Sequence, residues 1–123
     1  MKTELRTVDS KPMNAALTLR NAELTATQLQ QPLYKASLLL LICEQLVGTQ
    51  LHRAKTIHAQ IDIQSIEVIE APSARRVVAK WWEVKSMFGD RERVMSLREA
   101  ILRYRSVGCP NRARMLSSRL HSV

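Results

Sequence analysis

Residues that break helices or cross-link chains are scarce in this sequence. Only 3 Gly and 4 Pro interrupt 123 residues, which favours long helices over a β fold with many turns. Aromatic residues make up 4% of the chain, so a core would consist mostly of aliphatic side chains and Met. The two cysteines, Cys43 and Cys109, are too few for a disulfide scaffold or a four-cysteine metal site, and they indicate a reduced, cytoplasmic setting.

Segments that would direct the chain to a membrane are also missing. The stretch MKTELRTVDSKPM is polar and of mixed charge, without the apolar region of a signal peptide. The longest apolar run, Leu38–Cys43, is far shorter than the ~20 residues that a spanning helix needs. We therefore expect a cytoplasmic protein with no membrane partner.

Catalytic and cofactor-binding patterns are not found either. The chain has no Gly-rich phosphate loop, no HExxH and no GxSxG. Its three histidines, His52, His58 and His121, show no metal-ligand spacing. The sequence thus predicts a protein that is not an enzyme and that has no metal site and no cofactor.

Positive charge is concentrated in one part of the chain. Residues 1–74 contain seven Lys/Arg and seven Asp/Glu, which cancel, whereas residues 75–123 contain twelve Lys/Arg and four Asp/Glu. The whole net charge of +8 therefore lies in residues 75–123, and ten of the twelve cations there are Arg. Because the guanidinium group donates paired hydrogen bonds to phosphate and carboxylate, this asymmetry indicates an anionic partner.

Apolar spacing predicts a mainly α fold, a small helical bundle in one domain over 1–123 with a flexible tail over 1–12. We expect helices over 13–31, 33–47 and 50–60, and the 33–47 helix should be the most buried because apolar residues cover nearly all its sides. Gly48 would end that helix and Thr49 would cap the next. Residues 36–60 thus form a helix-turn-helix-like unit or an ordinary αα-hairpin.

The remaining chain predicts one ambiguous segment and three helices. Residues 60–71 fit a short strand, a hairpin or a continued helix, and the alternation over 60–64 favours the strand. Ser73 would cap a helix that ends at Gly89, and Asp90 would cap a helix to about residue 107 that ends at Gly108. A last helix begins at Pro110. The inward-facing residues of these helices are expected to be Val77, Trp81, Val84, Phe88, Val94, Leu97, Ile101, Tyr104, Ala113, Leu116 and Leu120.

Arginine recurs at every seventh position from residue 91 to residue 119. Arg91, Arg98 and Arg105 share one helix and one face, and Met95 and Leu102 lie on the same side. Such a face could be solvated, could bind a protein, or could contact phosphates. In the phosphate interpretation the contacts come from Arg91, Arg98, Arg105, Arg112, Arg114 and Arg119.

Base contacts, if the 36–60 unit enters a DNA groove, would come from the second helix. Arg can bind guanine through two hydrogen bonds, and Thr can bond a base edge. The residues on this face are His52, Arg53 and Thr56, with Lys55 at its flank. A second unit of this kind is conceivable at 98–120, although Arg114 occupies a position where a buried apolar residue is expected.

Candidate contacts with a protein partner form a separate set. Trp81 and Trp82 point about 100° apart on a helix. We expect one of them in the core and assign Trp82 to an interface, although both could be partly buried. Met95 and Leu102 complete the expected interface residues.

Three short segments carry a resemblance to a known family: TQLHRAKTIHAQI at 49–61, WWEVKSMF at 81–88 and AILRYRSVGCP at 100–110. In this order they resemble the C subunit of the flagellar master transcription activator and its mobile-element relatives. The resemblance implies a DNA-binding activator in a hetero-oligomer, with Arg53 on the DNA-facing helix. That family ends in a zinc-binding four-cysteine region, which two cysteines cannot form, so its full DNA-binding mode does not carry over.

Together these observations predict a DNA-binding transcriptional regulator, or a subunit of a DNA-bound complex, that forms a homo-oligomer or a hetero-oligomer. Double-stranded DNA is the expected partner. The alternative is an adaptor or inhibitor of the phage or plasmid type, which docks its basic Arg/Met/Leu helix face on an acidic protein.

Overall fold

The structure is a computed structural model that describes residues 31–122 of the chain. The tail predicted over 1–12 and the helix predicted over 13–31 lie almost entirely outside these residues, so both remain predictions, as does the single domain over 1–123. Leu33–Val123 form one compact unit by themselves.

The described residues are mainly α-helical, as predicted. A helix covers residues 31–46 and is followed by α2 (Leu51–Ala59), α3 (Ile63–Glu67), α4 (Pro72–Lys85), α5 (Asp90–Ser106) and α6 (Pro110–His121). No strand occurs between residues 31 and 122. None of the helices in this part of the chain combines the length and apolarity needed to cross a membrane.

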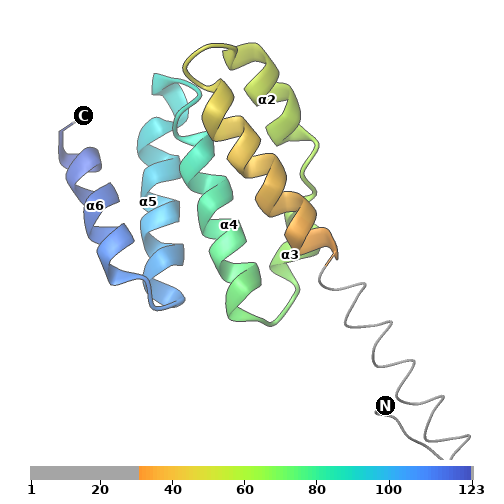
Figure 1. Cartoon of the computed structure of the whole chain (residues 1–123). Coiled ribbons are helices and arrows are strands. Elements are labelled where there is room, and N and C mark those ends of the chain that lie inside the picture. Colours follow the sequence, from red (N-terminus) through yellow and green to blue (C-terminus); the bar gives the residue numbers. More distant parts are fainter. Residues whose placement is uncertain (1–30, 123) are drawn as a thin grey trace, which may run out of the picture. The chain divides into compact units, whose positions relative to one another are not determined.

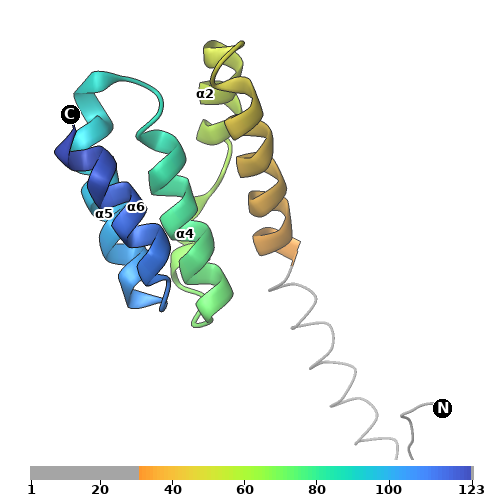
Figure 2. The ribbon, with the colours of Figure 1, turned by 60° about the vertical axis from the view of Figure 1, so that its left-hand side comes forward.

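The helices on either side of each of the turns at 47–50, 86–89 and 107–109 run in opposite directions (Figure 1). In both views α2 returns alongside the 31–46 helix, as in an αα-hairpin, and the Cys43 thiol donates to the Ala54 carbonyl at 3.4 Å between them (Figures 1 and 2). The predicted helix–turn–helix connection is therefore present at 31–59. Helices α4, α5 and α6 alternate in direction, and α5 packs against both α4 and α6 (Figure 1).

Two hydrophobic clusters meet at α4. One cluster joins the 31–46 helix, α2, α3 and α4 through Leu40, Cys43, Ile66 and Val78. The other joins α4 to α5 and α6 through Ala79, Leu97 and Leu116. The indole of Trp82 packs against both clusters, so α4 connects the two parts of the core.

The strand predicted over 60–71 is wrong. Residues Ile63–Glu67 form the single-turn helix α3, whose N-cap Asp62 accepts a hydrogen bond from the Ser65 backbone N–H at 3.4 Å. Ile61 and Ile66 are buried, and their spacing of five does not match a strand that alternates every second residue. The capping Asp, together with burial against α4, outweighs the β propensity of the isoleucines.

The prediction that the 33–47 helix is the most buried is also wrong. The 31–46 helix buries Ala36, Leu40 and Cys43 on its inner side, but Tyr34 and Leu41 remain 69% and 54% exposed. The most buried helix is α4, which is covered by α3 on one side and by α5 on the other. A helix that is apolar all round can be read from sequence, but how many neighbours cover it cannot.

Several predicted helix ends shift by one or two residues. The N-cap positions are Gln50, Ala71 and Gly89 in place of Thr49, Ser73 and Asp90, and none makes a side-chain cap bond. Gly108 ends α5 with φ of 77°, as predicted for a helix C-terminal glycine.

Val94 was predicted to face inward but is exposed. The contact of α5 with its two neighbours runs through residues 96, 97, 100, 101 and 104. Val94 lies just beyond the edge of that stripe, on the side where Arg98 also emerges.

Candidate functional site

The outward side of α5 carries the predicted row of arginines. Arg91, Arg98 and Arg105 are all exposed, and the row extends over about 21 Å at the 1.5 Å rise of a helix. Met95 and Leu102 lie between them and are 69% and 59% exposed. We call this surface the α5 basic face; with the exposed Val94 it consists of Arg91, Val94, Met95, Arg98, Leu102 and Arg105.

The arginines of the α5 basic face have no carboxylate partner within residues 31–122. On the flank of the same helix Arg103 is different, because it reaches Glu99 at 3.1 Å and Glu67 at 3.5 Å. Two of the three acidic residues of α5 pair with other cations: Glu99 pairs with Arg103, and Glu92 lies 3.6 Å from the Lys85 amine. The α5 basic face thus presents guanidinium groups that can bind an anion supplied from outside.

Arg112, the fourth arginine of the seven-residue repeat, has a different position. Its Nε donates to Glu83 Oε1 at 3.2 Å, and its Nη2 donates to Glu83 Oε2. Glu83 is fully buried on α4, and the Tyr104 hydroxyl also donates to its Oε1 at 2.8 Å. Two further cations lie at longer range, Lys80 Nζ at 3.8 Å from Oε1 and Arg119 Nη1 at 3.9 Å from Oε2. We call these five residues the Glu83 cluster.

Contacts within the Glu83 cluster shift the pKa values of Tyr104 and Arg112. Burial, together with the Glu83 carboxylate beside it, raises the pKa of the Tyr104 hydroxyl above its ordinary value. Partial burial opposes the charge of Arg112, but the hydrogen bonds and negative charge of Glu83 outweigh it and raise the pKa of Arg112. Arg112 therefore neutralises a buried carboxylate that links α4 to α5 and α6, which makes it a structural residue rather than an available phosphate ligand.

Two predicted phosphate ligands remain on α6. Arg114 is exposed, and its guanidinium donates to the Asn111 side chain in the first turn of the same helix. Arg119 is exposed in part and stays near the Glu83 cluster. The five-fold repeat therefore divides into three arginines that face solvent on α5 and two that approach Glu83 from α6.

The predicted base-contacting residues lie on α2, and His52, Arg53, Lys55 and Thr56 are all exposed. The Thr56 hydroxyl donates to the His52 carbonyl of its own helix at 3.0 Å, so it can only accept a bond from a base edge. Arg53 and Lys55 make no ion pair within the described residues, so both remain available to bind a ligand.

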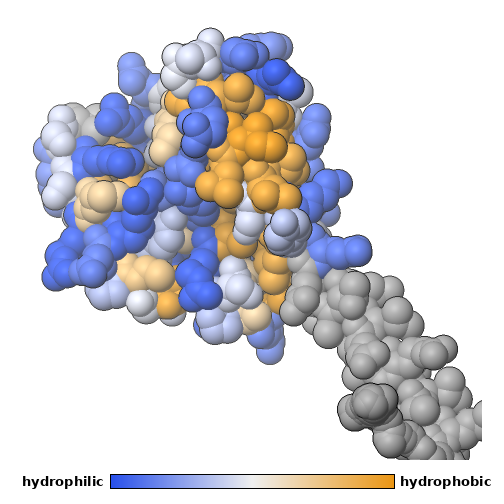
Figure 3. Space-filling model, in the orientation of Figure 1, coloured by the Kyte–Doolittle hydropathy of each residue, from blue (hydrophilic) through white to orange (hydrophobic). Residues whose placement is uncertain are grey.

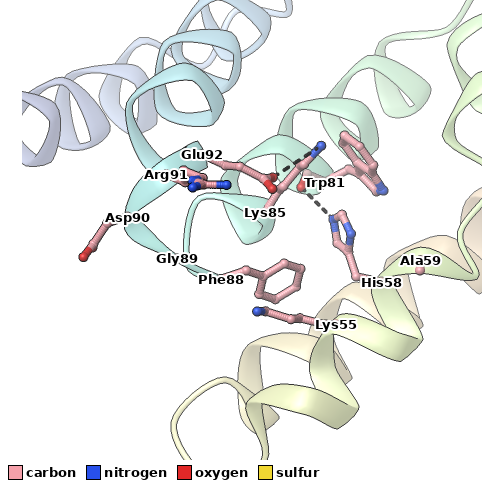
Figure 4. Close-up of a pocket in the computed structure, with 10 residues that line it drawn as sticks. All are labelled: Lys55, His58, Ala59, Trp81, Lys85, Phe88, Gly89, Asp90, Arg91 and Glu92. Carbon is pink, nitrogen blue, oxygen red and sulfur yellow. Dashed lines mark hydrogen bonds and ion pairs between the residues drawn. The ribbon is translucent and has the colours of Figure 1, made fainter.

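A cavity of about 480 Å³ brings the two candidate surfaces together (Figure 4). Lys55 of α2 lines one side of it, and Arg91 at the start of α5 lines the other (Figure 4). Trp81 and Phe88 form part of the wall, and the Lys85 amine lies 5.1 Å from the centroid of the Trp81 ring. The structure therefore places Lys55 close to the first arginine of the α5 basic face, which the sequence did not indicate.

His58 forms the aromatic centre of this wall. Its Nε2 donates to the Trp81 carbonyl at 3.0 Å, because a carbonyl can only accept, and its ring stacks on Trp81 with centroids 4.6 Å apart. Burial lowers the pKa of His58 below its ordinary value, and the nearby positive charge of Lys85 adds to this, although the bond to Trp81 acts in the opposite direction. His58 is thus a neutral packing residue between α2 and α4 near pH 7.

Trp82 does not form an exposed anchor. Both tryptophans are half-buried, with ring centroids 4.9 Å apart in an edge-to-face arrangement, and Trp82 packs between the two core clusters. The structure favours the alternative in which both tryptophans are partly buried. Met95 and Leu102, the other predicted interface residues, are exposed as the interface hypothesis requires.

Sequence analysis missed Glu83, the residue with the most polar contacts in the site. A signal for it was present, since Ala79, Glu83 and Ser86 lie at positions i, i+4 and i+7 on one face of α4 and all three are buried. A lone glutamate within the apolar face of a helix predicts a buried ion pair.

No metal-binding arrangement is present among residues 31–122, where no three His, Cys, Asp or Glu side chains converge. No family model, no curated protein and no solved structure matches this chain. Functional inference therefore depends on the geometry and charge of the molecule itself.

Proposed function

We propose that this chain binds double-stranded DNA through the α5 basic face and acts in the cytoplasm as a transcriptional regulator or as a subunit of a DNA-bound complex. The observation that supports the proposal most is the row of Arg91, Arg98 and Arg105, all exposed and all without an ion-pair partner in residues 31–122. No catalytic role is assigned to it.

The charge distribution supports a phosphate-binding role for this face. Duplex DNA carries one negative charge for about every 1.7 Å of its axis, so a row of arginines ~21 Å long can meet several phosphates. Binding them releases condensed counterions, which makes the affinity depend steeply on salt. The long aliphatic stems of Arg98 and its neighbours would lie over Met95 and Leu102 when the guanidinium groups contact the backbone.

Sequence preference, in this proposal, comes from α2. Arg53 is exposed on α2, about 200° around the helix from Lys55, the residue that lines a cavity with Arg91. The resemblance to the C subunit of the flagellar activator also assigns Arg53 to the DNA-facing helix. The same resemblance suggests an activator that works in a hetero-oligomer, and this part of the proposal depends on the resemblance alone.

The proposal is tested by anisotropy of a labelled random duplex with two variants of equal net charge. The first replaces the three arginines of the α5 basic face by Gln. The second replaces three exposed cations on the 31–46 helix and α4 by Gln, and serves as the matched control. The control substitutions are Lys35→Gln, Arg75→Gln and Arg76→Gln.

The first variant should lose most of its affinity, and its plot of log K against log salt should flatten by roughly three units, one for each phosphate contact. The control should change much less. Equal losses in the two variants would mean that only the net charge matters, which contradicts a specific role for α5.

A second candidate function is favoured by the exposure of Met95 and Leu102. A surface that only contacts phosphates needs no apolar side chains, whereas an acidic protein partner could cover both of them and pair its carboxylates with the arginines. Replacing both by Gln separates the candidates, because DNA affinity should be nearly unchanged while binding to an acidic protein should weaken.

A further inference from the structure

An apolar surface of four neighbouring side chains lies on the 31–46 helix. Tyr34, Leu38, Leu41 and Ile42 all remain exposed on its outer side, and Figure 3 shows hydrophobic residues gathered in one patch over this helix. Neither the proposed DNA surface nor the core of the compact unit uses these side chains. A soluble chain leaves few such patches open unless they bind something.

The spacing on this side is that of a helix–helix seam. Tyr34, Leu38, Leu41 and Gln45 follow one another at intervals of four, three and four residues. This is the a/d spacing by which two helices interlock in a coiled coil. We call these four residues the 34–45 seam. No charged residue lies within it, and Gln45 is its only amide.

We propose that the 34–45 seam is a dimer interface that binds the same seam of a second copy of this chain in antiparallel orientation. The register follows from the symmetry of the stripe about its midpoint. Leu38 of one copy then faces Leu41 of the other, and Tyr34 faces Gln45, whose amide can bond the tyrosine hydroxyl. Every member of the seam meets a complementary group of the second copy.

The residues beside the seam fit the same pairing. In an antiparallel pair, positions on the same flank of the two helices meet, so that Lys35 of one copy lies next to Ile42 of the other. The aliphatic stem of Lys35 can cover Ile42 while its amine stays in water. Within residues 31–46, whose charged side chains are Lys35 and Glu44, this register brings no two like charges together.

Charge distribution also favours a second copy at this face over one at the α5 basic face. Residues 31–74 contain three Lys/Arg and four Asp/Glu, so their net charge is −1. Residues 75–122 contain twelve Lys/Arg and four Asp/Glu, so their net charge is +8. Two copies that meet through the 34–45 seam therefore join their nearly neutral parts. Association through α5 would instead place three arginines against three arginines, which costs electrostatic energy.

The expected dimer is weak. Exposed patches on single chains are typically about 300–600 Å², while stable interfaces bury ~800 Å² per partner. The four side chains of the seam would bury an area near the smaller of these values. The dimer should therefore have a dissociation constant in the micromolar range or above. This inference does not depend on DNA binding, because the 34–45 seam contains none of the residues proposed to contact DNA.

The test is the sedimentation mass of the full chain over a hundredfold range of concentration. Wild type should approach twice the chain mass as concentration rises, and the variant with Leu38→Glu and Leu41→Glu should stay at the chain mass. A matched control with Met95→Gln and Leu102→Gln removes two exposed apolar side chains from α5 and should still dimerise.

A charge exchange makes the test specific for the register. The variant with Leu38→Lys and Leu41→Lys should also be monomeric, but an equimolar mixture of the Lys and Glu variants should recover the dimer, because positions 38 and 41 face each other. The proposal is overturned by a monomeric wild type, by dimers that persist in the Glu variant, by loss of the dimer in the α5 control alone, or by a mixture that stays monomeric. Circular dichroism of each variant at the same concentrations establishes that it is folded; these exposed positions are chosen because a polar residue there leaves the core intact.

Discussion

The buried carboxylate of Glu83 gives the sharpest prediction about stability. Glu83→Gln keeps the shape of the side chain and removes its charge, so the guanidinium of Arg112 loses its counterion while the Tyr104 hydroxyl can still donate to the new amide oxygen. Two charge-assisted hydrogen bonds from Arg112 are lost or weakened. Removing one member of a buried ion pair destabilises proteins by about 3–5 kcal/mol.

The expected loss lies just below this range. The Arg112 side chain is 34% exposed and can turn toward water once Glu83 is neutral. We therefore expect the free energy of unfolding to fall by about 2–3 kcal/mol. Glu99→Gln is the matched control, because it removes the same charge from an exposed i,i+4 pair with Arg103, which contributes only about 0.3–0.5 kcal/mol.

Urea unfolding followed by the fluorescence of Trp81 and Trp82 measures both variants. The midpoint for Glu83→Gln should fall by roughly 1–2 M relative to wild type, at an unchanged m value. The Glu99→Gln midpoint should barely move. Equal midpoints for the two variants, or a loss of less than about 1 kcal/mol for Glu83→Gln, would refute the structural role of the Glu83 cluster.

Three further predictions concern individual residues. The pKa of His58 is lowered in the folded chain, so the contribution of His58 to stability is present above its unfolded pKa of about 6.5 and is lost as the pH falls through its folded pKa. Thermal melts between pH 7.5 and 5 should show this loss of stability. The variant His58→Phe should lack this pH dependence. Gly108→Ala should destabilise the fold by about 1–2 kcal/mol because φ at this position is 77°. Gly48→Ala should be neutral or stabilising, because φ there is not positive and the added Cβ meets open space. Equal shifts of the melting temperature in the two variants would contradict this. Arg53→Ala should weaken binding to a preferred site, selected from random duplexes, by about 1–3 kcal/mol more than binding to random DNA; equal losses on both duplexes would exclude a base contact.

Periodicity in the sequence predicts the helices well. The stripes that place Leu97, Ile101 and Tyr104 inward, and Ala113 and Leu116 on one side of the last helix, are confirmed by their burial. These stripes follow from the 3.6-residue repeat, which any amphipathic helix must show if one side packs and the other meets water. The exposed position of Met95 and Leu102 follows from the same repeat.

The errors arise where neighbours rather than the local sequence decide. A run of isoleucines has β propensity, but Asp62 caps a single turn of helix and α4 covers it, so residues 60–71 contain no strand. Apolar residues cover most sides of the 31–46 helix, yet only the side with Ala36, Leu40 and Cys43 is buried in the core. Sequence cannot show which side of such a helix remains uncovered.

The candidate site is predictable in part. The exposed arginines of α5 follow from their spacing, but the partners of Arg112 do not, because Glu83 lies 29 residues away on another helix. The proximity of Lys55 to Arg91 depends on how α2 meets the start of α5, which no local pattern encodes. Contacts between distant helices therefore separate the structural arginine from those that remain available to a ligand.

The salt dependence of DNA binding by the wild-type chain tests the central proposal most directly. Binding constants for a random duplex, measured from 50 to 200 mM salt, give the slope of log K against log salt. The proposal predicts a slope between about −2.7, for the three arginines of α5 alone, and about −5.4, if Arg53, Lys55 and Arg114 also reach phosphates. Undetectable binding at the lowest salt, or a slope near zero, would contradict it.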